Sequence, residues 1–182
     1  VIAGTGGNAT SEAIALTEEM AEIARTAAAG GLSVAVHAIG DGANRAVLDA
    51  LEETRSAWEE VPVPPRIEHV QCIDDADLGR LGELGVTASM QPVHQRSDRD
   101  LADRLWGERA RCGYRWRDLL DSGAHLAFGS DAPIEDLDPL AGIDAAVNRD
   151  WYPDQRLDVA DAVLAFTAGA AHAVGEHLRR GL

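Results

Sequence analysis

The sequence contains no lysine, and all 16 of its basic residues are arginine. This absence excludes a Schiff-base lysine, a phosphate-loop lysine and a carbamylated lysine that bridges two metal ions within this chain. The 31 acidic residues give a formal net charge of −15, which would repel phosphate and argues against nucleic acid as a partner. An acidic surface of this kind is compatible with a small-molecule substrate.

Long apolar runs are absent too, although 46% of the residues are apolar. No run approaches the ~20 residues of a membrane-spanning helix. The first residues, VIAGTGGNAT, lack the basic and apolar regions of a signal peptide. The two cysteines, Cys72 and Cys112, form no Cys-x-x-Cys pair and are expected to be free thiols. These absences predict a globular cytoplasmic protein of one compact domain, without a membrane partner.

Short apolar segments alternate with amphipathic ones along the chain. Thr17 is expected to cap a helix that Gly30 and Gly31 end, and an apolar strand at 32–39 follows. Further helices are expected at 41–58, 74–85, 114–123, 134–149 and 159–179. The pattern predicts parallel strands near residues 33–37, 66–70, 86–90 and 126–130, adjacent in that order.

This alternation indicates an α/β fold with a parallel sheet. Four such strands make half of a (β/α)₈ barrel, a fold that normally takes ~250 residues. A doubly wound open sheet is the alternative. No Gly-x-Gly-x-x-Gly follows the first strand, which weakens the dinucleotide-binding form of that alternative.

Polar residues stand where the expected strands end: His37, His69, Gln91 with the nearby His94, and Asp131. In a barrel, catalytic groups lie at the carboxyl ends of the strands. Imidazole and carboxylate are ligands that suit Zn²⁺ or a similar divalent ion.

Taken singly, each of these residues has an ordinary structural explanation. A lone histidine at a strand end is more often a hydrogen-bonded structural residue than a ligand, and Asp131 could cap the following turn. Glu68 should point to the opposite face of its strand from His69 and act as an ion-pair partner outside the barrel. His125 begins its strand and is expected to be structural. The joint pattern at several strand ends favours a metal site.

Three stretches carry a resemblance to a known family: VAVHAIGDGANRAVLDALE, RIEHVQCIDDADLGRLGELGVTASMQPVHQRSD and YRWRDLLDSGAHLAFGSDAPIEDLDPLAGIDAAV. They resemble the amidohydrolase superfamily, and within it the amidohydrolase-3 group, which includes YtcJ-like proteins and N-substituted formamide deformylases. The resemblance implies that His37 and His69 are metal ligands after the fifth and sixth barrel strands. It also implies that Asp131, after the eighth, is a ligand and proton shuttle. His94 and Gln91 are implied as substrate-binding residues.

The sequence also departs from that family. The His-x-His pair of the family's first strand is absent. A bridging lysine or another ligand is expected after the fourth strand, and the sequence has no lysine. We therefore expect residues 1–182 to be a partial barrel domain, strands five to eight, without the N-terminal half and the small β-domain. The implied function is metal-dependent hydrolysis of a C–N bond in a small molecule, with zinc as the expected metal and iron or manganese as alternatives.

Two further expectations follow from the sequence. The 182-residue chain alone is expected to be inactive. The alternative to an enzyme is a non-catalytic half-barrel fragment, or a degenerate homologue, that self-associates through its open strand edges as a homo-oligomer. The stretch from His94 to Arg111 is longer than an ordinary connection and is expected to contain some helix over the mouth of the barrel.

Overall fold

Helices and strands alternate along the chain in a computed structural model, which describes residues 9–181, with side chains from Thr17 onward. The strands are β1 (Ala35–Ala38), β2 (Arg66–His69), β3 (Thr87–Met90) and β4 (His125–Phe128). The α-helices are α1 (Ala9–Ala29), α2 (Asp41–Glu53), α3 (Arg55–Trp58), α4 (Leu78–Leu84), α5 (His94–Trp106), α6 (Trp116–Asp121), α7 (Pro139–Val147), α8 (Val159–Leu164) and α9 (Ala170–His172). Short 3₁₀ turns are η1 (Gly107–Cys112) and η2 (Pro153–Gln155), and η3 (Ala165–Gly169) is a π-turn.

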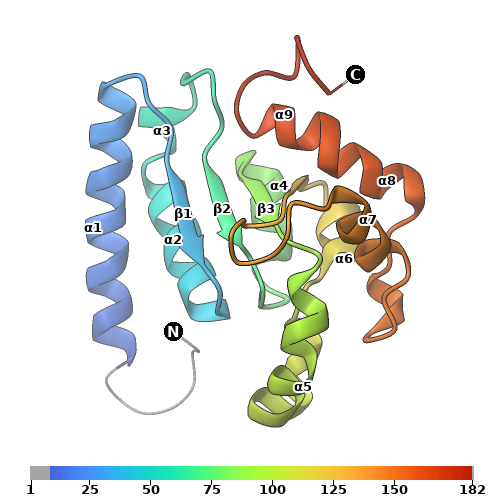
Figure 1. The fold of residues 1–182 in the computed structure, drawn as a ribbon. Coiled ribbons are helices and arrows are strands. Elements are labelled where there is room, and N and C mark those ends of the chain that lie inside the picture. Colours follow the sequence, from blue (N-terminus) through green and yellow to red (C-terminus); the bar gives the residue numbers. More distant parts are fainter. Residues whose placement is uncertain (1–8, 182) are drawn as a thin grey trace.

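The described strands form one parallel sheet in the order β1-β2-β3-β4. Figure 1 shows α2 and α4 behind these strands, with α1 outside α2. The sequence prediction of four parallel neighbours in chain order, and of an α/β fold built as half of a barrel, is confirmed. All four strands run the same way, so their carboxyl ends lie at one edge of the sheet.

Apolar side chains on the helix-facing side of the sheet form the core. Ile67 and Ala88 of the strands are fully buried against Leu48, Leu81 and other side chains of the helices. Asn44, at the start of α2, is fully buried, and its amide nitrogen donates to the carbonyls of Gly40 and Cys72. This side chain ties the turn after β1 to the segment after β2, which fixes two strand ends relative to each other.

Several boundaries differ from the sequence prediction. Thr17 is not a helix cap, because α1 is already helical from Ala9. The helix expected at 41–58 is split at Thr54, whose hydroxyl donates to the carbonyl of Ala50. The helix expected at 159–179 becomes α8, η3 and α9 and ends at His172. Among the described residues, none of the helices is long and apolar enough to cross a bilayer.

Candidate metal centre

Three side chains from different strand ends meet above the sheet. His69 is the last residue of β2, His94 is the first residue of α5, and Asp131 follows β4. One ligand atom from each lies within 4.8 Å of the others, the one such group that the described residues form. Two imidazole nitrogens and a carboxylate oxygen are the donor types that zinc and related divalent ions take in proteins.

The backbone at His69 turns its ring toward this group. Strict alternation along β2 would place His69 on the side of the fully buried Ile67. His69 instead has a φ of 80°, in the left-handed region that residues with a side chain rarely adopt. Its ring reaches that of His37, with 4.5 Å between the ring centroids. Asp131 also has a positive φ, of 58°, so two of the three residues are held in costly conformations, a feature that clusters at functional sites.

Gln91 fixes the orientation of the His69 ring. Its side-chain oxygen lies 2.8 Å from His69 Nδ1, so in the tautomer where Nδ1 carries the proton it accepts that hydrogen bond. Nε2 of His69 is then an unprotonated nitrogen able to bind a cation. Burial, followed by the neighbouring His37, lowers the pKa of His69, while Gln91 and Asp131 act in the opposite direction. The lowered pKa favours the neutral ring that ligation requires.

His94 lies between two carboxylates. Its Nδ1 is 3.2 Å from Glu135 Oε1, and its Nε2 is 3.5 Å from Asp131 Oδ2. If Nδ1–H donates to Glu135, then Nε2 and the Asp131 oxygen are both acceptors that face each other. Two ligands of a tetrahedral zinc ion, bonded at roughly 2.0–2.2 Å, lie about 3.3 Å apart. The spacing of His94 and Asp131 therefore fits a cation held between them.

The three residues line a pocket of about 430 Å³. The other acidic residues of its lining add to the attraction for a cation. Asp98 and Glu135 line it together with Asp131, and none of its lining residues is an arginine. The nearby arginines of α5 point to other acids, Arg96 to Asp144 and Arg99 to Asp150. The full lining is His37, Ile39, His69, Gln71, His94, Ser97, Asp98, Asp131, Ile134 and Glu135.

The structure brings the predicted site residues to one edge of the sheet but groups them differently. His69 and Asp131 meet as expected, and His94 joins them as a third donor. His37 lines the same pocket and contacts His69, outside the group of three. Gln91 is buried beside His69 and does not line the pocket. The roles of all five residues stay predictions.

The position of Glu68 and the presence of Glu135 at the site differ from the sequence prediction. Glu68 pairs with Arg66 at 2.6 Å, as expected of an ion-pair partner. The register aligns it with His37, so the two share a face of the sheet, and its expected position outside the barrel is wrong. Glu135 was not predicted as a site residue. Its position four residues after Asp131, close to a strand end, is the feature of the sequence that could have indicated it.

The model of the amidohydrolase family matches residues 3–182, so the chain belongs to the amidohydrolase family. It is 39% identical over 165 residues to protein LONG AFTER FAR-RED 3 from Arabidopsis thaliana, a match that covers 86% of this chain and 28% of that protein. It is 33% identical over 180 residues to the putative amidohydrolase YtcJ from Bacillus subtilis, covering 90% of this chain and 32% of that one.

Among solved structures, an uncharacterized metal-dependent hydrolase from Pyrococcus furiosus superposes with a TM-score of 0.80 at 38% identity. The match covers 91% of this chain and 34% of that one. The chain thus spans about a third of the length of the proteins it resembles. The resemblance to the amidohydrolase-3 group seen in the sequence is confirmed.

Proposed function

We propose that the protein is a metal-dependent hydrolase that cleaves a C–N bond of amide type in a small molecule. The observation that carries this proposal is the convergence of His69, His94 and Asp131, with donor atoms within 4.8 Å of one another. The similarity to a hydrolase called metal-dependent supports it. Zinc fits the donor set, and iron or manganese would fit it as well.

Each residue of the centre then has a distinct task. His69 and His94 hold the ion, with Gln91 and Glu135 as the partners of their other ring nitrogens. When bound, the ion supplies two effects: it lowers the pKa of a coordinated water toward about 7, and it polarises the substrate carbonyl. His37, exposed at the edge of the same pocket, is a further ligand or a contact to the substrate.

We assign the proton transfer of the reaction to Asp131. Its side chain is 39% exposed, so one carboxylate oxygen can face the ligand group while solvent and substrate reach the other. In the hydrolysis, the oxygen of water bonds to the carbonyl carbon and the C–N bond breaks. Asp131 accepts a proton from the attacking water and returns it to the leaving nitrogen. The products are a carboxylic acid and an amine.

Metal content and hydrolysis, measured together on the full-length gene product, test this proposal. We expect elemental analysis to find a divalent metal after dialysis against Zn²⁺, and amine release from a panel of simple amides, N-formyl amines and cyclic ureas. His69→Ala and His94→Ala should lose both. His125→Ala is the matched control, because His125 lies at the opposite end of β4, beside His172. Metal retained in His69→Ala would contradict the assignment of the centre.

The same measurement shows whether His37 and His94 are metal ligands or substrate contacts. A ligand, when replaced by alanine, should lose metal and activity together. A substrate contact should keep the metal and lose roughly ten- to a thousandfold in kcat/KM. The spacing of His94 from Asp131 favours loss of metal in His94→Ala.

A non-catalytic half-barrel that self-associates is the second candidate. The observation that favours it is the position of β1, which pairs with β2 and has no second neighbour among residues 9–181. On this alternative the protein binds little metal and hydrolyses none of the panel.

A further inference from the structure

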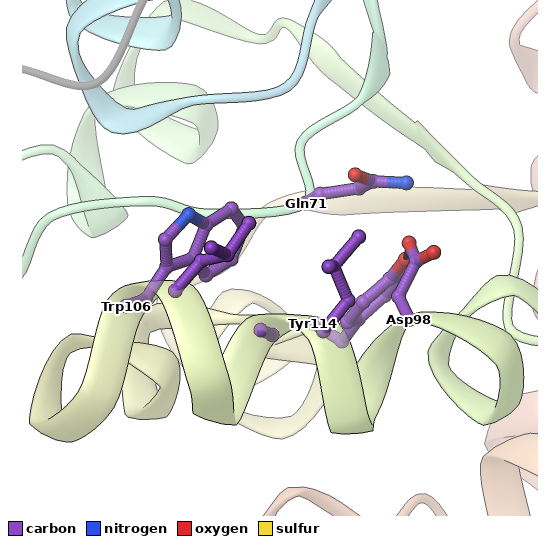
Figure 2. Close-up of a pocket in the computed structure, with 7 residues that line it drawn as sticks. Gln71, Asp98, Trp106 and Tyr114 are labelled. Carbon is purple, nitrogen blue, oxygen red and sulfur yellow. Dashed lines mark hydrogen bonds between the residues drawn. The ribbon is translucent and has the colours of Figure 1, made fainter.

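A second hollow lies beside the candidate metal centre, between α5 and the segments that contain Gln71 and Tyr114 (Figure 2). Its volume is about 160 Å³. Gln71 and Asp98 line both this hollow and the pocket of the metal centre, so the two spaces meet at these residues. We call it the α5 pocket; its lining is Gln71, Asp98, Leu101, Ala102, Leu105, Trp106 and Tyr114.

The α5 pocket has an apolar end and a polar end. Figure 2 shows the indole of Trp106 on one side, and the amide of Gln71 and the carboxylate of Asp98 together on the other. The polar side is the one shared with the metal centre. The remaining lining comes from Tyr114 and from aliphatic side chains of α5. A molecule that lies across both spaces would therefore present polar atoms to the centre and apolar atoms to Trp106.

The wall formed by Tyr114 is fixed in place from behind. Tyr114 is 1% exposed, and its hydroxyl donates to Asp98 Oδ2 at 2.5 Å. The buried guanidinium of Arg149 donates to the carbonyls of Gly113 and Tyr114 and lies over the rings of Trp116 and Trp151. Because these interactions hold Tyr114 in place without a ligand, the pocket is preformed, as ligand sites usually are.

We propose that the α5 pocket binds a compact apolar substituent of the substrate, which makes the substrate an amide-type compound with one ring-sized or branched hydrocarbon group. This inference rests on the proposed hydrolase function for the position of the amide. A dry apolar cavity of roughly 150 Å³ takes up benzene, so about 160 Å³ matches a single six-membered ring. Ala102 provides the space, since a larger side chain at this buried position of α5 would occupy it.

Acetamide and benzamide are the probes that test the pocket, because they share the carboxamide and differ in the apolar group. Their dissociation constants are measured by calorimetry on the full-length gene product, without need of turnover. Benzamide should bind at least about tenfold more tightly than acetamide, since its ring leaves water for an apolar site. Equal affinity would overturn the proposal, and this is the result expected if another segment of the protein already fills the pocket.

Two variants that reduce the pocket complete the experiment. Leu101→Trp changes a side chain that is 47% exposed, so folding should tolerate it, and Ala102→Leu fills the pocket from its buried wall. Both should weaken benzamide binding at least about fivefold and leave acetamide unchanged. Arg104→Ala, at an exposed position of α5 outside the pocket, is the control and should alter neither. A preference for benzamide that survives both filling variants would overturn the proposal.

The same preparations separate this inference from the proposed function. Metal content and amine release report on the hydrolase, and the ratio of the two probe affinities reports on the pocket. Loss of the benzamide preference in the filling variants supports the pocket even if the protein proves to hold no metal. Hydrolysis without any preference for benzamide would support the hydrolase function and overturn the proposed role of the α5 pocket.

Discussion

His69 shows how one backbone conformation assembles a site from residues that strand alternation would separate. Its neighbours in β2 follow the alternation, with Ile67 buried and Glu68 on the face of His37. The left-handed φ of His69 brings its ring onto that face as well, against the ring of His37. Such a conformation persists only where surrounding contacts outweigh its cost, which is on the order of 1–3 kcal/mol. The hydrogen bond that His69 Nδ1 donates to the side-chain oxygen of Gln91 is one of these contacts.

Gln91→Leu tests whether Gln91 orients this ring. The leucine cannot accept the hydrogen bond from Nδ1, so the ring is free to change tautomer and rotate. We expect metal affinity to fall by about 10- to 100-fold, measured by competition with a chelator of known affinity. Gln91→Glu keeps an acceptor at the same place and should stay close to the wild type. A raised KM with unaltered metal affinity in Gln91→Leu would instead make Gln91 a substrate contact, as the family resemblance implies.

At the residue scale, the sequence predicts which side chains gather but not how they are arranged. His69, His94 and Asp131 could be placed near one another because parallel strands end at one edge of a sheet. The pairing of His94 with Glu135 could not be predicted, because it depends on the path of the chain between Asp131 and α7. The positive φ values of His69 and Asp131 were also beyond prediction, since only a few per cent of residues other than glycine adopt them, even though Asp and His do so more often than most.

At the scale of elements, the C-terminal helix shows where tertiary packing overrides local propensity. Residues 159–179 are rich in alanine and favour one continuous α-helix. The structure instead inserts η3, where Gly169 lies directly against β4. A Cβ atom at Gly169 would stand 2.0 Å from the carbonyl oxygen of Leu126. The close approach of two backbones therefore requires glycine, and the helical register adjusts to it.

Gly169→Ala measures the importance of this contact. We expect the free energy of unfolding to fall by about 2–3 kcal/mol, because η3 must move away from β4 to accommodate the methyl group. Gly79→Ala is the matched control, since its Cβ would meet only the end of the Glu83 side chain, at 3.7 Å. It should be neutral or stabilising by up to about 1 kcal/mol in the helix α4. Urea unfolding followed by circular dichroism provides both numbers. Equal stabilities for the two variants would contradict this account of η3.

For the molecule as a whole, the two ends of the sheet differ. The last strand, β4, is covered by η3 and α9, which pack against it. The first strand, β1, ends the described sheet, and Ala35 and His37 on it are exposed. An uncovered strand presents unpaired backbone groups and invites pairing with another chain. A full barrel would cover this edge with a further strand, and we propose that residues outside 1–182 form one.

This difference predicts the behaviour of residues 1–182 expressed alone. We expect this chain to self-associate through β1, with sedimentation velocity showing dimers or larger species at micromolar concentration. Ala35→Lys adds a charge at the exposed edge strand, a change that natural proteins use against edge pairing, and should weaken association by about 1 kcal/mol, roughly fivefold in Kd. Leu178→Lys is the matched control, because Leu178 is 83% exposed and follows α9, the helix that packs against β4 at the other end of the sheet. If Leu178→Lys dissociates the complexes and Ala35→Lys does not, the chains associate through the C-terminal surface. The edge of β1 is then not the interface.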